Sequence, residues 1–490
     1  MKTIRKILIS LLILPITAQS AQAFCGFYVA KADAKLFNNK SEVIMVRDGI
    51  HNVITMSSDF KGSLKDFAMV VPVPVVLKEK DIRVVERNIF DVLDDYSAPR
   101  LVEYYDQNPC AADLYNNNVS DCLSRVKPIQ TIALNEENID KKYGVKIEAH
   151  YSIEEYEVLI LSATESNGLK NWLLDNGYQI PTAAEEVLNP YIKSNMKFFV
   201  VKVNVEKAIK NNTGYLRPIQ LSFDHEKFML PLRLGMANSE GTQDMIVYAF
   251  SKTGRVECTN YRTVKLPTDR NIPLYAQQKF GTFYKSLFDK EYRAQGRNAV
   301  FLEYAWNVSP YVSMKCDPCV GPPPINQDFV TAGVNWLETP NPTVFFTRLH
   351  VRYSRDKFPA DLQFQVTPNT ENFQCRYILT HPASGDLSCE QGQKYLSDLY
   401  NRRKREIDEV YALAGWNYNT LATGYLNEIV GQMKEKPQQD QKNEFIPTLP
   451  DSPSPDGNSS NPLPGILIIL SMLLIATYKY KLPQKQNLSS

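Results

Sequence analysis

The tetrapeptide Cys316-Asp-Pro-Cys319 is the stretch of this 490-residue chain whose residue types and spacing best suit chemistry. Two cysteines separated by two residues can form a redox-active dithiol, half of a zinc site or a structural disulfide. A thioredoxin-type motif needs a helix that begins at the motif, because the helix N-terminus lowers the pKa of the first thiol. Val320-Gly-Pro-Pro-Pro324 follows instead, and its three prolines forbid that helix. We therefore favour a small structural ring, Cys316–Cys319, with redox and metal roles as the alternatives.

Other patterns that carry chemistry are weak in this sequence. There is no nucleophile elbow, no His-Glu-x-x-His and no glycine-rich nucleotide-binding motif. His225-Glu226 is adjacent in a strand-like context, where neighbouring side chains point to opposite faces, so we expect no shared metal or acid/base role. We interpret three acidic pairs as solvated turn or helix-start residues rather than carboxylate dyads: Glu154-Glu155, Glu185-Glu186 and Asp94-Asp95. The sequence therefore predicts no catalytic residue, no metal site and no cofactor.

The histidines give no additional support for a metal site. A zinc ribbon needs a second Cys-x-x-Cys or a paired histidine motif at a suitable spacing. The five histidines occur singly, at His51, His150, His225, His350 and His381.

The N-terminus has the pattern of a secretory signal peptide over residues 1–23. A basic start precedes an apolar run from Ile7 to Ile16, and Ala21-Gln22-Ala23 supplies a small-x-small cleavage site. The apolar run is too short to span a bilayer. Cleavage between Ala23 and Phe24 then starts the mature chain at Phe24, and a bulky residue before Cys25 argues against a lipoprotein signal. We expect the protein to be exported.

The C-terminus has the pattern of a membrane anchor. Within the segment 463–480, residues 463–478 carry no charge and would cover roughly 24 Å as a helix, a little short of the ~30 Å hydrocarbon core. No Lys or Arg lies between Glu444 and Pro464, whereas lysines cluster from Lys479 on, so the positive-inside rule places the tail 481–490 in the cytoplasm. A polar, Pro/Ser/Asn-rich linker, residues 436–462, joins the segment to the rest and is predicted to be disordered. A cleaved sorting signal is the main alternative to a retained transmembrane helix.

All eight cysteines follow the cleavage site, and an even number in an exported chain indicates disulfide bonds. Proximity favours two pairs, Cys110–Cys122 and Cys375–Cys389. With the ring Cys316–Cys319, a Cys25–Cys258 bridge remains by elimination.

Composition and pattern predict a globular α+β ectodomain over residues 24–435. Its length also favours two sub-lobes, 24–268 and 269–435. With 55 basic and 54 acidic residues, the chain offers no electrostatic case for nucleic acid. Strands and irregularly interspersed helices favour a mixed, strand-rich fold. Expected strands are Glu42–Arg47, His51–Met56, Val145–Tyr151, Tyr156–Ser162, Met196–Val205, Ile219–Phe223, Lys227–Leu234, Met245–Ser251, Arg255–Lys265, Ala299–Val308, Thr343–Tyr353, Leu362–Thr367 and Asn372–Thr380.

Two local details accompany these strands. Asp48-Gly49 predicts a hairpin turn, and two prolines in Phe67–Val76 make that stretch an edge strand or an extended buried segment. Expected helices are Asp81–Asp95, Ser166–Asn176, Thr182–Lys193, Leu274–Ala294 and Gln391–Val430.

An ordered set of short stretches resembles one bacterial exported family, the domain of unknown function 2330. The stretches are Phe24-Cys-Gly-Phe-Tyr-Val29, Val70-Val-Pro-Val-Pro74, Gly168–Tyr178, Leu216–Phe223, Leu230–Leu234, Ile246–Phe250, Tyr304-Ala-Trp306 and Cys316–Cys319. The resemblance covers most of residues 24–333. It implies export and a mixed fold, and it supplies no activity or catalytic residue.

Two functional hypotheses follow. The favoured one is a membrane-anchored extracytoplasmic module of the bacterial cell envelope, structural or binding, with an envelope protein or glycan as its partner. The alternative is an envelope enzyme, either a hydrolase or a thiol oxidoreductase that uses the Cys316–Cys319 loop. The 27 tyrosines and 22 phenylalanines could line a groove for such a partner, although they also suit the faces of sheets.

Overall fold

A computed structural model describes residues 27–29, 37–38, 41–57, 60–61, 68–111, 143–176, 184–204, 207, 216–237, 241–310, 322–417 and 419–433. The predicted signal peptide, linker, apolar segment 463–480 and tail lie outside these residues. So does the Cys316–Cys319 loop. Within the described ranges no helix has both the length and the apolar character needed to cross a bilayer.

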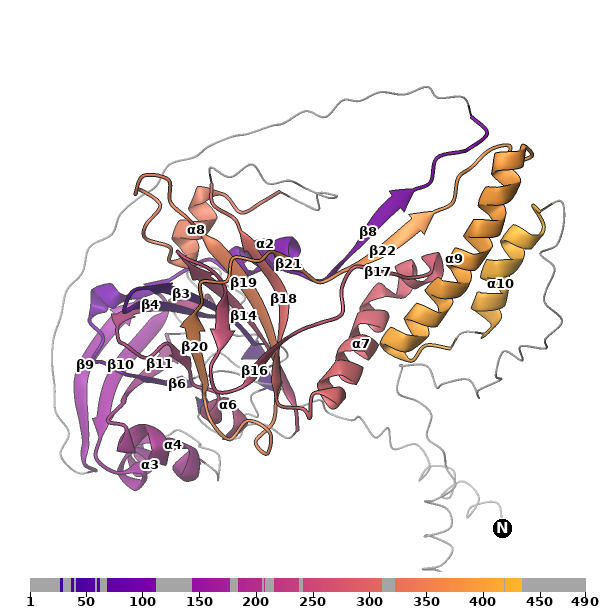
Figure 1. Cartoon of the computed structure of the whole chain (residues 1–490). Helices are drawn as coiled ribbons and strands as arrows, with labels where there is room; N and C mark the ends of the chain where they lie inside the picture. Colours follow the sequence, from indigo (N-terminus) through magenta and orange to yellow (C-terminus); the bar gives the residue numbers. More distant parts are fainter. Residues whose placement is uncertain are drawn as a thin grey trace, which may run out of the picture.

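A nine-stranded sheet forms the centre of the molecule (Figure 1). Eight strands follow one path in the order β16-β18-β19-β14-β3-β4-β12-β7, and β21 pairs with β18. Neighbours are antiparallel, except that β3 runs parallel to β14 and β16 parallel to β18. The strands are β3 (Ser41–Asp48), β4 (His51–Ser57), β7 (Ile82–Val84), β12 (Ile219–Asp224), β14 (Gln243–Ser251), β16 (Arg262–Lys265), β18 (Ala299–Asn307), β19 (Phe345–Tyr353) and β21 (Phe373–Gln374).

A second, five-stranded sheet has the order β1-β6-β11-β10-β9 and is antiparallel throughout. Side chains of α3 and α4 pack on one of its faces, where Trp172, Leu188 and Phe198 are buried together. The elements are β1 (Phe27–Val29), β6 (Ala68–Val73), β9 (Val145–Ile153), β10 (Tyr156–Ala163), β11 (Lys197–Val203), α3 (Ser166–Asp175) and α4 (Ala184–Lys193).

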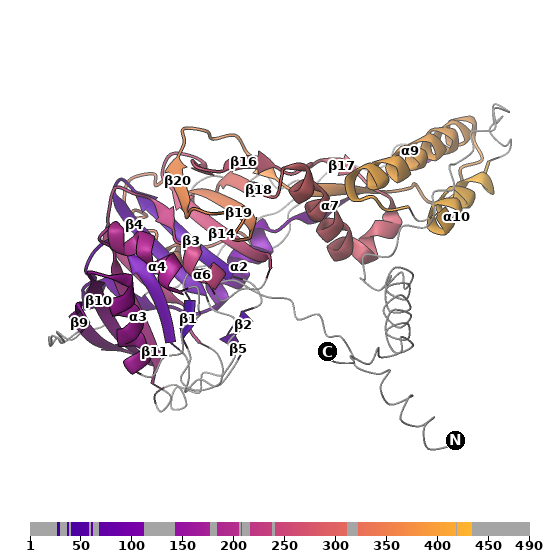
Figure 2. The same cartoon turned by 90° about the horizontal axis from the view of Figure 1, so that it is seen from below.

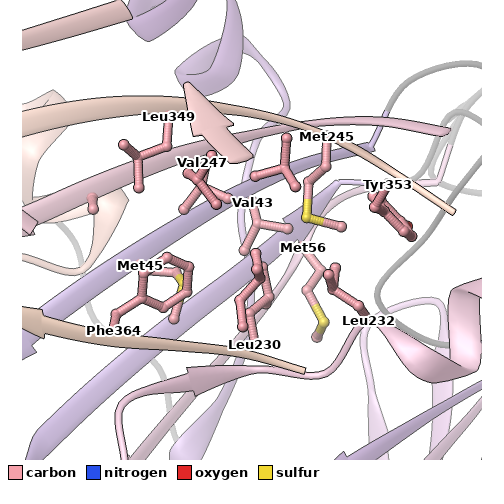
Figure 3. Close-up of a cluster of buried hydrophobic side chains, with 14 of the residues drawn as sticks. Val43, Met45, Met56, Leu230, Leu232, Met245, Val247, Leu349, Tyr353 and Phe364 are labelled. Carbon is pink, nitrogen blue, oxygen red and sulfur yellow. The ribbon is translucent and has the colours of Figure 1, made fainter. Parts of the chain in front are cut away.

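The main core lies on one face of the nine-stranded sheet. Figure 3 shows Val43, Met245 and Leu349 of that sheet together with Leu230 and Phe364 of the small sheet β13-β20-β15. Residues of the five-stranded sheet belong to the same buried cluster. The small sheet contains β13 (Met229–Leu230), β15 (Val256–Cys258) and β20 (Leu362–Val366), and α6 (Arg233–Ala237) follows β13.

The opposite face of the nine-stranded sheet is covered by α2 and α8, which bury Phe90 and Phe329 against Phe250 and Phe346. A three-stranded parallel ladder, β17-β22-β8, leads away from the sheets, and α9 and α10 project from the strand-rich body at its end (Figures 1 and 2). These elements are α2 (Asn88–Ser97), α8 (Asn326–Ala332), β8 (Arg100–Tyr105), β17 (Arg270–Asn271), β22 (Arg376–His381), α7 (Phe280–Ala294), α9 (Glu390–Ala414) and α10 (Asn419–Val430).

The remaining described elements are short. They are β2 (Phe37–Asn38), β5 (Phe60–Lys61), η2 (Glu79–Asp81) and η3 (Leu274–Lys279).

The predicted mixed, strand-rich α+β class is confirmed. The hairpin is also confirmed, but Asp48 pairs with His51, so the two-residue loop begins at Gly49, whose φ of +59° suits glycine. The long helix Gln391–Val430 is split at Gly415, a left-handed residue that ends α9. The nine-stranded sheet takes strands from both suggested sub-lobes, 24–268 and 269–435, so it crosses that boundary.

Three local predictions need correction. The stretch Asp81–Asp95 is helical only from Asn88, because Ile82–Val84 pairs with β12 as the sheet edge. The expected strand Lys227–Leu234 is reduced to two residues, since Pro231 follows and cannot donate a ladder hydrogen bond. Of the two alternatives for Phe67–Val76, the extended buried segment is confirmed and the edge strand is wrong, because β6 is a buried inner strand. β1 pairs with residues 68–70 and β11 with 68–73, so Pro72 lies beyond the end of β1.

Candidate functional site

A cavity of about 220 Å³ lies between the end of α4, the turn after β12, α6 and the start of β20. Charged and polar side chains line part of it, and prolines and methionines line the rest. The lining includes Tyr191, His225, Lys227, Arg233 and Asp361. This mixture of a few placed polar groups with apolar walls is typical of small-molecule sites.

Asp361 is the acidic group of this cavity, and its carboxylate is held from one side. Its Oδ1 atom accepts hydrogen bonds from the Tyr191 hydroxyl at 2.6 Å and from the backbone N–H groups of Leu232 (2.9 Å) and Arg233 (3.2 Å). The other oxygen, Oδ2, accepts no hydrogen bond from the described residues. Burial raises the pKa of Asp361, although the Tyr191 hydroxyl, the two backbone N–H groups and the charge of Arg233 oppose this.

Arg233 is the basic counterpart on the wall of the cavity. None of its guanidinium nitrogens makes a hydrogen bond or ion pair with another described residue, and its Nε is buried without a partner. The Nε atoms of Arg255, Arg402 and Arg403 are also buried without a hydrogen-bond partner among the described residues, so this atom alone does not mark a site. A guanidinium presents donors in a planar fork that matches carboxylate or phosphate.

The turn that carries His225 and Lys227 is fixed by a side chain from the neighbouring hairpin. Arg47 donates to the carbonyls of His225 and Glu226, both at 2.8 Å, and its guanidinium lies 5.5 Å from the ring centroid of Phe228. His225 and Lys227 therefore stand at the cavity on a braced turn.

The other wall is fixed in a comparable way by the segment after β15. The amide of Asn260 donates to the carbonyl of Asp361 at 2.7 Å, and its side-chain oxygen accepts from the backbone of Gln363 at 3.0 Å. The Tyr261 hydroxyl donates to the Ala360 carbonyl at 3.0 Å and accepts from the Ala360 N–H at the same distance. Rigid positioning of this kind favours a preformed site.

A second polar cluster lies on the nine-stranded sheet beneath α2 and α7. Glu303, whose side chain is 1% exposed, accepts from Arg348 Nε at 2.5 Å and contacts His350 Nδ1 at 2.8 Å. His350 Nε2 lies 3.1 Å from Asp244, which also accepts from Arg352. Burial alone would raise the pKa of Glu303, but Arg348 and His350 lower it, to about 2.

The cluster continues through Arg348 to Asp94 of α2 at 2.6 Å, and Tyr248 links Asp94 to Glu42. Asp244 likewise has a lowered pKa: burial opposes the shift, and His350 and Arg352 cause it. Because its charges pair with one another, we interpret this cluster as structural.

The structure corrects the predicted disulfide pairs. Cys110 bonds to Cys389, 279 residues away, and not to Cys122; Cys375 is a buried free thiol, and so is Cys258. The parallel pairing of β8 with β22 explains the change, because it brings the end of β8 next to the start of α9. Cys25, Cys122, Cys316, Cys319 and the cleavage site Ala23–Phe24 lie outside the described residues.

The structure places the residues of the adjacent pairs named in the sequence analysis in different environments. His225 lies in the turn after β12 rather than in a strand, and it lines the cavity, whereas the Glu226 carbonyl accepts a hydrogen bond from Arg47. Glu155 is not solvated: it is fully buried and accepts from Arg217 Nε at 3.0 Å. Asp94 belongs to the cluster around Arg348. No group of three or more His, Cys, Asp or Glu in the described ranges could hold a metal ion.

Sequence reasoning missed Tyr191, Arg233 and Asp361. No motif joins them, since Tyr191 and Asp361 are 170 positions apart. Pro231, two residues before α6, is the nearest local signal, because it ends β13.

Fold and cavity together define a strand-rich α+β protein with a small, partly charged cavity. Residues 19–365 match a family model described as "Uncharacterized protein conserved in bacteria (DUF2330)". The match covers more than half of the chain, so the protein belongs to this family. Curated proteins and solved structures give no match.

Proposed function

We propose that the protein is a membrane-anchored, extracytoplasmic binding module of the bacterial cell envelope, and that the cavity at Arg233 and Asp361 holds its ligand. The single observation that carries the binding role is the Arg233 guanidinium, which lines the cavity without a described hydrogen-bond partner. A guanidinium presents donors in a planar fork, and a bound carboxylate or phosphate would pair with it.

The location rests on independent support. Residues 1–23 have the pattern of an export signal, and residues 463–480 that of a membrane anchor followed by lysines. The Cys110–Cys389 bond suits an oxidising compartment. The module would thus stand outside the cytoplasmic membrane on the linker 436–462.

Reporter fusions in a bacterial host test the location. Alkaline phosphatase, which is active only in an oxidising compartment, is fused after residue 435 or after residue 490. We expect activity at 435 and none at 490, with membrane association lost when residues 463–480 are deleted. An inactive fusion at 435 would contradict an extracytoplasmic location, and an active fusion at 490 would contradict the anchor orientation.

A further inference from the structure

Opposite charges line the cavity and interact across it without a direct ion pair. Asp361 receives the backbone N–H of Arg233 at 3.2 Å, yet no ion pair within 4.0 Å joins its carboxylate to the Arg233 guanidinium. Two such groups serving only the fold would gain by pairing directly. From this separation we propose that the cavity binds a small zwitterion with a free carboxylate and a free ammonium group, an amino acid or a short peptide. The proposal rests on the binding role given above and specifies its ligand.

The anionic end of the ligand is assigned to Arg233. A carboxylate accepts two parallel N–H···O bonds from a guanidinium, and the Arg233 side chain lines the cavity without an ion-pair partner among the described residues. Lys227 and His225 line the same cavity, and Lys227 is exposed and bears a positive charge. The basic side of the cavity therefore suits a carboxylate and disfavours a second cation.

The cationic end is assigned to Asp361. All three of its hydrogen bonds fall on Oδ1, which leaves Oδ2 able to accept from an ammonium group. The Tyr191 hydroxyl and two backbone N–H groups fix the orientation of the carboxylate before any ligand arrives. Such preorganisation reduces the entropic cost of binding.

Size and apolar lining narrow the ligand further. Pro74, Met196 and Met229 form an apolar part of the wall that suits a hydrocarbon side chain. At about 220 Å³ the cavity is smaller than the 300–1,000 Å³ typical of sites for drug-sized molecules. A single amino acid or a dipeptide fits this size better than a longer chain.

Calorimetric titration of the detergent-solubilised full-length protein tests the proposal. The probes are alanyl-alanine, its N-acetyl derivative, its C-terminal amide and inorganic phosphate. We expect the free dipeptide to bind. Blocking either end should lower the affinity by about tenfold or more, because each blocked end loses a charge-assisted hydrogen bond.

Two variants test separately the recognition of the carboxylate end and of the ammonium end of the ligand. R233Q should bind the free dipeptide and its amide equally weakly, and D361N, which keeps the acceptor for Tyr191, should lose the preference for a free amine. The exposed Arg262 in β16 provides the control, and R262Q should bind like the wild type.

Equal affinity for the free and the blocked dipeptides would overturn the proposal, as would no binding of any dipeptide. If only phosphate bound tightly, and this binding were lost in R233Q, the proposal of a zwitterionic ligand would also be overturned. The cavity would still have a binding role. A failure of the reporter fusions, in contrast, would overturn the location and not the ligand.

Discussion

Glu303 and His350 form a buried carboxylate–imidazole contact across two neighbouring strands, with 2.8 Å between Oε1 and Nδ1. A β-bulge makes this contact geometrically available. The pairing of β18 with β19 shifts register between Leu302 and Tyr304, so that Glu303 is the extra residue. Asp244 approaches the other imidazole nitrogen, and His350 therefore lies between two carboxylates.

Replacing Glu303 by glutamine should strongly destabilise the fold. The substitution removes the buried one of the two carboxylates that pair with each of Arg348 and His350, and breaking a buried ion pair costs about 3–5 kcal/mol. Urea denaturation would measure the free energy of unfolding. The control is E185Q, because Glu185 is 43% exposed and its contact with Lys170 is expected to contribute less than about 1 kcal/mol. Equal losses in both variants would contradict this role of Glu303.

Stability should also depend on the protonation of His350. Burial by itself lowers the pKa of His350, but Glu303 and Asp244 outweigh it, so the pKa is raised. A raised pKa in the folded state contributes stability that is complete below about pH 6.5, the unfolded value, and is lost as the pH rises through the folded value.

Urea denaturation between pH 6 and 9 checks this sign. The advantage in unfolding free energy of the wild type over H350Q should shrink as the pH rises. H150Q, which removes a histidine whose side chain is 55% exposed, serves as the control. A wild-type advantage that grows with pH would contradict the prediction.

Local patterns in the sequence predicted local structure well. The hairpin Ser41–Ser57 and helix α7 depend on contacts between near neighbours, so alternation, turn residues and helical spacing are sufficient to find them. The class and the family could also be predicted. Pairing between distant segments could not be predicted. β7 is a strand because it pairs with β12, and this pairing outweighs the helical spacing of apolar residues after Asp81.

The same reason explains the cysteines and the cavity. Cys110 meets Cys389 only because β8 and β22 run side by side, and sequence proximity carries no information on that pairing. Arg233 and Asp361 come together through β13 and β20, which pair across more than a hundred residues. A charged residue gives no local sign that it will lack a partner in the folded protein.

The two buried thiols should be unreactive in the native protein. Burial raises the pKa of Cys258 and of Cys375, and only the thiolate reacts with alkylating agents. Iodoacetamide at pH 8, followed by peptide mass spectrometry, should label both residues only after denaturation. Rapid native labelling of either one would contradict its burial. Native labelling of Cys316 or Cys319 in the same experiment would instead support the thiol-enzyme hypothesis.

Two glycines on the projecting helices should respond in opposite directions to alanine. A Cβ at Gly392, in the first turn of α9, would lie 2.4 Å from the carbonyl oxygen of Leu387 and 2.6 Å from Sγ of Cys110. The backbone oxygen cannot yield cheaply, so G392A should cost about 1–3 kcal/mol of unfolding free energy. It should also lower the fraction of protein in which the Cys110–Cys389 bond has formed.

Gly424, within α10, is the matched control. A Cβ there would meet no atom within 4 Å, and alanine is the better helix former by about 0.5–1 kcal/mol, so G424A should stabilise the protein. Urea denaturation gives the two free energies, and intact mass after alkylation counts the thiols that remain unbonded. If G392A were as stable as G424A and fully bonded, the close packing of α9 against Cys110 would be contradicted.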